Sequence, residues 1–408
     1  MPAASSSRSG RLRYERLLVA LRIWLVRLAF YFGRLLPVRQ RVVLATAHLD
    51  HIQGNLAAIR DEVDRREPPI GLTVLAYRAQ PNLIGLLRGA LNALVAGYHL
   101  ARARIFVVDD YFFPIYVVRP RRGTTIVQVW HACGAFKRFG LSIGDRSFGA
   151  SATLTRMVRI HSNYDVCLAS SEETAGCYAE AFGQPLDRFV WTLGIPRTDI
   201  LLRQPQASET RQRVRQQYGL PEGRRVVLYA PTFRGDRTYD AAHPAGLDLD
   251  LLRRALGGDH TLLLRQHPFV RSRQPLDELS DFVVDVSDHP DVNELMLASD
   301  VLVTDYSSVI FEFALLGRPI VLFAPDHAAY ERERGFYFDY RTEGPGPVFE
   351  TSAELARYIR ASDFDAARVE AFSRRWFTVA DGRAAERFVD RLVVPALDGR
   401  WAGPDSLR

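Results

Sequence analysis

Two histidines stand where a proton acceptor and a phosphate ligand would be expected. His131 directly follows the apolar run 125–130, where a strand of a parallel sheet would give way to a loop. An imidazole group titrates near neutral pH and is therefore suited to taking a proton from a reacting hydroxyl. The alternative is a strand-end histidine that is bonded only to backbone. The position makes His131 a candidate general base.

His267 follows a second predicted strand, 261–265, and alternates onto the same side as Arg265. A planar guanidinium group and an imidazole N–H are donors that bind a diphosphate well. Arg234, which follows Tyr-Ala-Pro-Thr-Phe, would add a further cation. These three residues predict an anion site on the C-terminal half of the chain.

The strongest local signal is the segment 300–319, which reads as a strand, a short polar turn, a helix, a glycine and a proline. Ser307 and Ser308 fall at the predicted start of the helix, where hydroxyls and free N–H groups can bind phosphate. Ordinary capping, the alternative, needs only one serine. Asp305 would bond a sugar hydroxyl, orient His267 or position an acceptor. Glu312, one turn later, resembles acids that hold a nucleotide ribose.

The remaining polar residues predict less chemistry. His48, His51, His161 and His327 read as structural residues more readily than as ligands. The three cysteines lack C-x-x-C spacing, which argues against a zinc site and favours a reducing compartment. No carboxylate cluster has the spacing of metal ligands. We therefore expect no required cofactor and no structural metal, with a loosely bound Mg²⁺ on a phosphate donor as the remaining option.

The elements that would position these residues alternate between strands and helices, which is typical of βαβ units and a parallel sheet. A polar segment at 201–217 divides them into two sets. The predicted strands cover 42–47, 72–77, 105–109, 125–130 and 166–169, then 225–230, 261–265, 282–286, 301–304 and 320–323.

This order predicts an α/β protein with two doubly wound, Rossmann-like domains, whose ligands lie at the carboxyl ends of strands and in the cleft between domains. The predicted parts are a basic N-terminal segment (1–38), an acceptor-side domain (39–205), a donor-side domain (206–350) and C-terminal helices that pack back across the domains (351–408).

Charge is concentrated at the N-terminus. Residues 1–45 contain nine arginines and a single acid, Glu15, a net charge of +8, whereas the whole chain carries +6. The rest of the chain therefore sums to −2, which argues against a nucleic-acid-binding domain.

Four interpretations of this segment can be compared: a signal peptide, a membrane span, a helix on a membrane surface and a helix packed on the protein. Arg22 and Arg27 interrupt the apolar stretch, so neither a signal peptide nor a span of about 18–20 apolar residues is indicated. A basic helix on an anionic membrane surface, with Trp24, Phe30 and the two aromatics after it in the interface, is favoured. The alternative is a helix that packs on the domain it precedes.

Five segments together resemble the CDP-glycerol glycerophosphotransferase family, whose members prime and extend teichoic acids. They are Trp-His with Gly134 and Lys137, Tyr-Ala-Pro-Thr-Phe-Arg at 229–234, Leu-Arg-Gln-His-Pro at 264–268, the segment 300–319, and Arg-Gly-Phe-Tyr-Phe-Asp at 334–339. The match runs in order from about residue 40 to 392. Many members read Trp-His-Gly, whereas Ala132 and Cys133 precede Gly134 here.

The resemblance implies a GT-B-like fold, peripheral attachment to the cytoplasmic face of the membrane and a CDP-alditol donor, with CDP-glycerol expected first. The acceptor would be a hydroxyl on a polyprenyl-diphosphate-linked polymer, and no nucleic acid would be bound. His131 and His267 correspond to two histidines important in the family. The other expected donor residues are Arg265, Thr304, Asp305, Ser307, Ser308, Glu312, Thr232 and Arg234, and the expected acceptor-side residues are Gly54, Asn55, Trp130 and Lys137.

Three alternatives remain from the sequence. The chain could be a ribitolphosphotransferase that uses CDP-ribitol, or a glycosyltransferase of the same fold that uses a nucleotide-sugar, because the fold does not distinguish attack on phosphorus from attack on carbon. It could also be a membrane-bound nucleotide sensor without turnover, against which the presence of both histidines argues.

Overall fold

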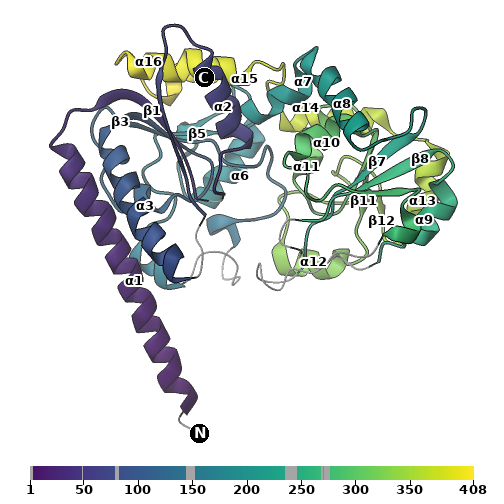
Figure 1. The fold of residues 1–408 in the computed structure, drawn as a ribbon, viewed down its shortest axis with the longest axis horizontal. Helices are drawn as coiled ribbons and strands as arrows, with labels where there is room; N and C mark the ends of the chain where they lie inside the picture. The colour runs from purple at the N-terminus through teal and green to yellow at the C-terminus, as the bar shows by residue number, and fades with distance from the viewer. Residues whose placement is uncertain are drawn as a thin grey trace. The chain divides into compact units, whose positions relative to one another are not determined.

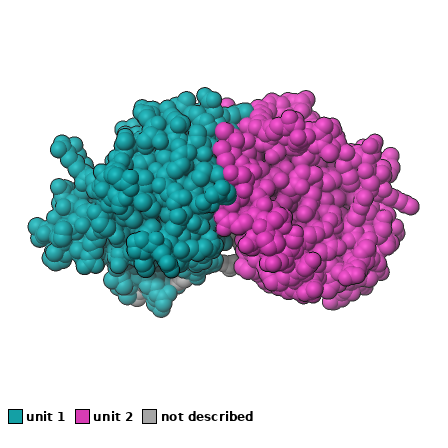
Figure 2. Space-filling view, turned by 90° about the horizontal axis from the view of Figure 1, so that it is seen from above, with its two compact units in different colours: residues 1–131, 140–197, 383–408 teal, residues 132–139, 198–382 magenta. Residues whose placement is uncertain are grey.

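The computed structural model describes residues 3–47, 49–78, 82–143, 152–234, 246–267, 270 and 276–408. It divides into two compact units, each built on a six-stranded parallel sheet (Figures 1 and 2). Unit 1 comprises residues 1–131, 140–197 and 383–408, and unit 2 comprises residues 132–139 and 198–382. The two parallel sheets confirm the predicted fold class.

Unit 1 has the strand order β2-β1-β3-β4-β5-β6, and its central strands are buried runs of apolar residues. Its strands are β1 (Arg39–Thr46), β2 (Gly71–Ala76), β3 (Ala103–Val108), β4 (Thr125–Gln128), β5 (Val166–Leu168) and β6 (Phe189–Val190). Its α-helices are α1 (Ala3–Arg34), α2 (Gly54–Asp64), α3 (Leu83–Arg102), α4 (Phe113–Tyr116), α5 (Ala152–Met157), α6 (Glu172–Phe182), α15 (Ala384–Phe388) and α16 (Val394–Leu397).

Unit 2 has the strand order β12-β11-β10-β7-β8-β9, with a core between this sheet and helices α9 and α13. Its strands are β7 (Arg225–Tyr229), β8 (His260–Leu264), β9 (Val283–Asp285), β10 (Val301–Thr304), β11 (Ile320–Phe323) and β12 (Val348–Phe349). Its α-helices are α7 (Asp199–Leu202), α8 (Gln206–Gln217), α9 (Leu249–Leu256), α10 (Val292–Ala298), α11 (Val309–Ala314), α12 (His327–Arg334), α13 (Ser352–Ala361) and α14 (Ala366–Trp376).

The boundaries differ from the predicted domains in three places. The units meet in the chain at 197–198 rather than near 205, and residues 132–139 belong to unit 2. The C-terminal residues 383–408 return to unit 1, where Asp390 pairs with Arg66 at 2.6 Å. Residues 351–382 stay with unit 2. These long-range contacts leave no periodic signal in the sequence.

Helix α1 is part of unit 1 and packs along α3 (Figure 1). Val26 and Phe30 are fully buried, so the expectation that Phe30 enters a membrane interface is wrong. The two helices approach closely where glycines replace larger residues: a Cβ on Gly97 would lie 2.4 Å from the Val26 carbonyl oxygen. Trp24, Tyr31 and Phe32 remain exposed on the opposite side. No described helix is long and apolar enough to cross a bilayer.

Candidate active site

His131 ends the segment that follows β4 in unit 1, and two buried amides fix the backbone before it. The Asn55 amide, at the start of α2, donates to the carbonyl oxygens of Val129 and Trp130 at 3.0 and 2.9 Å. Gln128 accepts the Trp130 N–H at 2.8 Å. Both amides are 2% exposed or less. Polar side chains at this depth are costly unless bonded, so their pairing points to a backbone that must be held.

The residue that these amides hold is in an unusual conformation. Trp130 has a φ of 51°, in the left-handed region that non-glycine residues rarely adopt. Such a residue costs about 1–3 kcal/mol and is typically found at functional sites. Its indole ring lies against the imidazole ring of His131, with centroids 4.4 Å apart. The strained turn thus sets the direction in which His131 leaves the sheet.

A backbone carbonyl oxygen and a carboxylate, from the two residues that follow strand β3, face one nitrogen of His131. Nδ1 lies 3.3 Å from the Asp109 carbonyl oxygen and 3.9 Å from the Asp110 carboxylate. The His131 side chain is about half exposed, at 47%. A proton on Nδ1 would be donated to these oxygens, which makes Nε2 the basic nitrogen. This arrangement, a carboxylate beside a histidine that remains accessible, suits a general base.

The predicted acceptor-side residues separate into two places. Gly54, Asn55 and Trp130 gather around His131 in unit 1, where the Asn55 side-chain oxygen also accepts the Arg197 N–H at 2.9 Å. Trp130 is buried and supports the turn. Lys137 belongs to unit 2 instead: it pairs with Phe336 in a β-bridge, and its Nζ lies 5.4 Å from the Tyr330 ring centroid.

The other histidines singled out from sequence have structural environments. His161 is buried and stacks on Phe182, and burial lowers its pKa to about 3. His327 is buried against Tyr340, and His51 is exposed beside Asp50. His48 lies outside the described residues.

In unit 2, Arg265 and His267 follow the carboxyl end of β8. The Arg265 N–H donates to the Tyr229 carbonyl oxygen at 2.9 Å, which continues the pairing of β8 with β7. Its guanidinium Nη1 is buried and has no hydrogen-bond partner among the described residues. Burial lowers the pKa of Arg265, and the charge of Asp291 offsets this shift only in part. The imidazole of His267 contacts Phe233, with ring centroids 4.7 Å apart. A buried guanidinium donor in this state is suited to an anionic ligand.

Arg234, Thr232 and Asp305 form one network after β7 and β10. Arg234 contacts Asp305 at 2.8 Å and Asp326 at 2.6 Å. The Thr232 backbone N–H and hydroxyl both donate to Asp305. Burial alone would lower the pKa of Arg234, but the two carboxylates raise it above its usual value. The charge of Arg234 is therefore compensated within the protein, so its first role in this structure is to brace the loop after β7.

The segment between β10 and α11 carries the remaining predicted donor residues. Thr304 is buried and donates to the Ala230 carbonyl oxygen at 2.6 Å. Ser308 precedes α11 without a capping side-chain bond, and Ser307 Oγ accepts the Val309 N–H only at 3.4 Å. Glu312 is buried on α11. Helix capping thus makes little use of the two serine hydroxyls, as a ligand-binding role requires.

The loop 132–139, which follows His131 in the chain, packs against other residues of unit 2. The Phe136 ring stacks on the Phe336 ring, with centroids 5.1 Å apart. The Phe136 carbonyl oxygen accepts the Tyr337 N–H at 3.0 Å. Gly134 packs directly on Phe311 of α11, since a Cβ there would lie 2.4 Å from that ring. The segment 334–339 is therefore a docking partner for this loop within unit 2.

Sequence reasoning missed four residues of this arrangement. Gln128 and Arg197 hold the His131 turn, Asp110 faces its imidazole, and Asp326 binds Arg234. Only Gln128 could have been noticed from the sequence, because it is a polar residue within a run of mostly apolar residues that was predicted to be a buried strand.

The geometry combines two parallel-sheet α/β units, with a candidate general base, His131, in unit 1 and candidate anion ligands, Arg265 and His267, in unit 2. A family model described as CDP-Glycerol:Poly(glycerophosphate) glycerophosphotransferase matches residues 29–394. The chain therefore belongs to this family, and it is an enzyme of that phosphotransferase type. The resemblance read from its motifs is confirmed.

Relatives of known sequence agree with this assignment, and a solved structure shares the fold. The chain is 38% identical to the teichoic acid ribitol-phosphate primase of Bacillus spizizenii over 87% of its own length and 92% of that protein. It is 28% identical to the teichoic acid glycerol-phosphate primase of Bacillus subtilis, over 84% and 90%. A structure of the wall teichoic acid polymerase TagF shares the fold, with a TM-score of 0.77, 23% identity, and coverage of 97% of this chain and 99% of that one.

Proposed function

We propose that the protein transfers an alditol phosphate from a CDP-alditol to a hydroxyl of a lipid-linked teichoic-acid-type acceptor, with release of CMP. Family membership supports the reaction class. The single observation that carries the donor assignment is the buried Arg265 guanidinium nitrogen without a hydrogen-bond partner among the described residues. A diphosphate would supply the missing acceptor and offset the buried charge.

In the proposed reaction, Nε2 of His131 takes the proton of the acceptor hydroxyl. The hydroxyl oxygen attacks the phosphorus that bears the alditol, and the bond from that phosphorus to the CMP oxygen breaks. Arg265 and His267 stabilise the charge that develops on CMP, while Ser307 and Ser308 bind the phosphate oxygens. Asp110 favours the His131 tautomer that carries its proton on Nδ1, and it stabilises the imidazolium that forms when Nε2 takes the second proton. Catalysis of this kind depends mainly on positioning and electrostatics.

The donor is tested by comparing substrates directly. Glycerol is the alditol that the sequence motifs favour, whereas the 38% identity to a ribitol-phosphate primase favours ribitol. Incubation with CDP-glycerol, CDP-ribitol and a panel of UDP- and GDP-sugars, with a synthetic lipid-linked acceptor, identifies the product by mass. Transfer from either CDP-alditol supports the proposal. Transfer of a sugar from a nucleotide-sugar alone would contradict it.

Replacing both Ser307 and Ser308 by alanine should weaken donor binding without abolishing it. Two hydroxyls are lost while the backbone N–H groups remain, so the expected cost is about 1–3 kcal/mol in donor affinity. Calorimetric titration with the CDP-alditol measures it. Ser280→Ala is the control, because the Ser280 hydroxyl is exposed and donates to the Asp277 carbonyl oxygen. A double variant with unchanged donor affinity would place the phosphates elsewhere.

We also propose that α1 and α3 attach the protein to an anionic membrane surface. Apolar side chains recur along the exposed side of α1 at spacings of three and four residues, opposite the buried Val26 and Phe30. They are Tyr14, Leu17, Leu21, Trp24, Leu28 and Tyr31, and the exposed Leu35 follows directly after the helix. Helix α3, which packs on α1, adds exposed Ile84, Leu87 and Leu91. The arginines of α1 supply the attraction to anionic head groups.

Exchanging Leu17, Trp24 and Leu28 for serine should reduce sedimentation with anionic liposomes at least about tenfold, because each side chain would lose apolar burial in the bilayer. All three are exposed in the free protein, so the fold should be preserved, unlike in a deletion of α1. Leu186→Ser, an exposed leucine elsewhere on unit 1, is the control. Wild-type binding should also decrease in high salt. Full co-sedimentation of the triple variant would refute this surface.

A further inference from the structure

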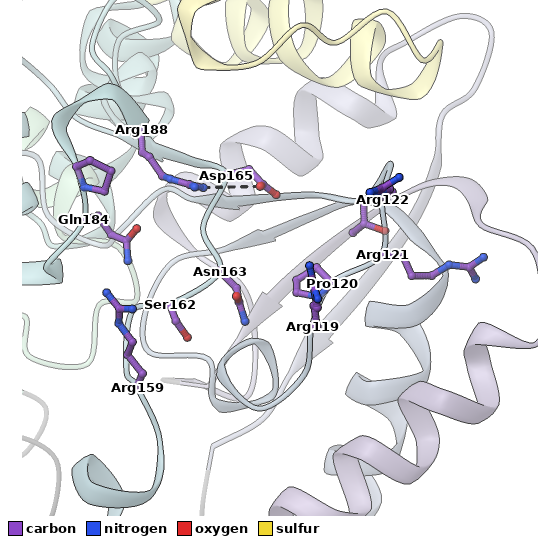
Figure 3. Close-up of a pocket in the computed structure, with 12 residues that line it drawn as sticks. Arg119, Pro120, Arg121, Arg122, Arg159, Ser162, Asn163, Asp165, Gln184 and Arg188 are labelled. Carbon is purple, nitrogen blue, oxygen red and sulfur yellow. Dashed lines mark ion pairs between the residues drawn. The ribbon is translucent and has the colours of Figure 1, made fainter.

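Unit 1 contains an arginine-lined pocket at the amino-terminal edge of its sheet, whereas His131 lies at the opposite, carboxyl-terminal edge. The pocket has a volume of about 650 Å³, and Figure 3 shows the residues that line it. They lie in the segments that enter β4, β5 and β6, at the amino ends of these strands. His131 lies past the carboxyl end of β4. From Thr124 to His131 the chain covers about 20 Å, given about 3.3 Å per extended residue.

The lining is strongly cationic. Five arginines surround the pocket, against the single carboxylate of Asp165, and the lining contains no large apolar side chain. The five are Arg119, Arg121, Arg122, Arg159 and Arg188. Asp165 is already engaged, since it accepts the Ile126 N–H at 2.8 Å and lies 3.8 Å from Arg188. Its charge therefore offsets little of the remaining positive potential.

Two of these arginines bind backbone carbonyl oxygens through their side chains, and three do not. Arg121 binds carbonyl oxygens at the end of α1, and Arg188 binds the Tyr164 carbonyl oxygen. By contrast, the guanidinium groups of Arg119, Arg122 and Arg159 form no hydrogen bond or ion pair with any residue that the structure describes. Exposed arginines elsewhere in unit 1, such as Arg60 and Arg400, pair with carboxylates.

The wall of the pocket is held in place by specific bonds. Asn163, with a φ of 68°, donates to the carbonyl oxygens of Ile115 and Val118 at 2.8 and 2.9 Å. Gln184 donates to the His161 carbonyl oxygen at 2.7 Å, and His161 also has a positive φ. Ordinary surface loops do not require two residues in this conformation. The bonds keep an open, polar cavity in front of the cations.

We propose that this pocket binds the phosphodiester groups of an alditol phosphate chain, as a secondary site for the growing polymer. The inference rests on the proposed function, because repeated transfers by that reaction build a chain with one negative charge per unit. The pocket is larger than a single phosphate needs and falls in the range of ligand pockets, about 300–1,000 Å³. A membrane surface is disfavoured as the occupant, because the exposed apolar stripes lie on α1 and α3. Chains of several units would be held at both edges of the sheet.

The test compares two triple variants of equal charge. Arg119→Gln, Arg122→Gln and Arg159→Gln are combined in one protein, and the exposed Arg254, Arg357 and Arg360 of unit 2 are exchanged for glutamine in the control. The probe is a lipid-free, fluorescently labelled oligo(glycerol phosphate). The pocket variant should bind it about tenfold more weakly than the wild type and the control. The slope of log affinity against log salt should fall by about 2, at about 0.7 for each lost contact.

Turnover separates this site from the catalytic one. In the pocket variant, KM should rise for an acceptor with a long polymer and stay unchanged for a single-unit acceptor and for the donor. Arg159→Gln alone should give a smaller loss in the same direction. Equal losses in both triple variants, or no loss in either, would overturn the proposal. So would a loss of binding to polymer-free anionic vesicles with oligomer binding intact. A wild type that binds the oligomer through this pocket but transfers nothing from either CDP-alditol would refute the proposed function and leave the pocket supported.

Discussion

The His131→Ala variant is expected to lose about 10²–10⁴-fold in kcat, the usual contribution of a general base. Affinity for the CDP-alditol should be nearly unchanged, because His131 belongs to unit 1 and the proposed phosphate ligands belong to unit 2. Single-turnover kinetics with saturating donor measure the chemical step, and calorimetry measures donor binding. The two together separate loss of a base from loss of a binding residue.

Controls for this prediction come from the surroundings of His131. His51→Ala removes an exposed histidine of the same unit, bonded to Asp50, and should leave kcat unchanged. Asp110→Asn keeps the shape but removes the carboxylate 3.9 Å from Nδ1, and should lower kcat less than His131→Ala does. If donor affinity collapsed in His131→Ala while bound donor still reacted at the normal rate, the assignment of His131 as base would be wrong.

The strands and the two-sheet architecture were predictable because buried parallel strands are short, β-branched runs separated by helical spacing. Strands 301–304 and 320–323 match β10 and β11 residue for residue. Strands β6 and β12 were missed, since two residues each carry no periodic pattern. The exposed apolar residues of α1 repeat every three or four positions, whereas the prediction of a membrane-surface helix rested mainly on its arginines.

The candidate reactive residues could be identified from the sequence, whereas the residues that hold them in place could not. His131, Arg265 and Ser307 follow recognisable strands, and motif spacing marks them. Asn55 was noted, but its bonds to the carbonyl oxygens of Val129 and Trp130 join residues more than 70 positions apart. Asp305 shows the limit most clearly: the motif suggests a ligand, and the structure commits its carboxylate to Thr232 and Arg234. Contacts of this kind depend on tertiary packing alone.

Arg265→Gln should weaken donor affinity by about 1.5–3 kcal/mol, or roughly 10- to 150-fold, because hydrogen bonds to charged groups have this worth. The same change should leave the ligand-free protein as stable as the wild type, or more stable. In the free protein, Arg265 keeps a buried Nη1 without a hydrogen-bond partner among the described residues, and burial lowers its pKa. Asp291 offsets this buried charge only in part, so removing the charge relieves a desolvation cost.

A second partly buried arginine provides the matched control for this last prediction. Burial also lowers the pKa of Arg318, but its Nη1 donates to the carbonyl oxygens of Met296, Leu297 and Ser299. Arg318→Gln should therefore lower the thermal stability of the free protein and leave donor affinity intact. Thermal unfolding with and without the CDP-alditol separates the two cases, since a ligand that binds only the folded state raises the unfolding temperature. The donor should stabilise the wild type and Arg318→Gln, but much less Arg265→Gln. If Arg265→Gln instead destabilised the free protein and kept normal donor affinity, Arg265 would be a structural residue and the diphosphate would bind elsewhere.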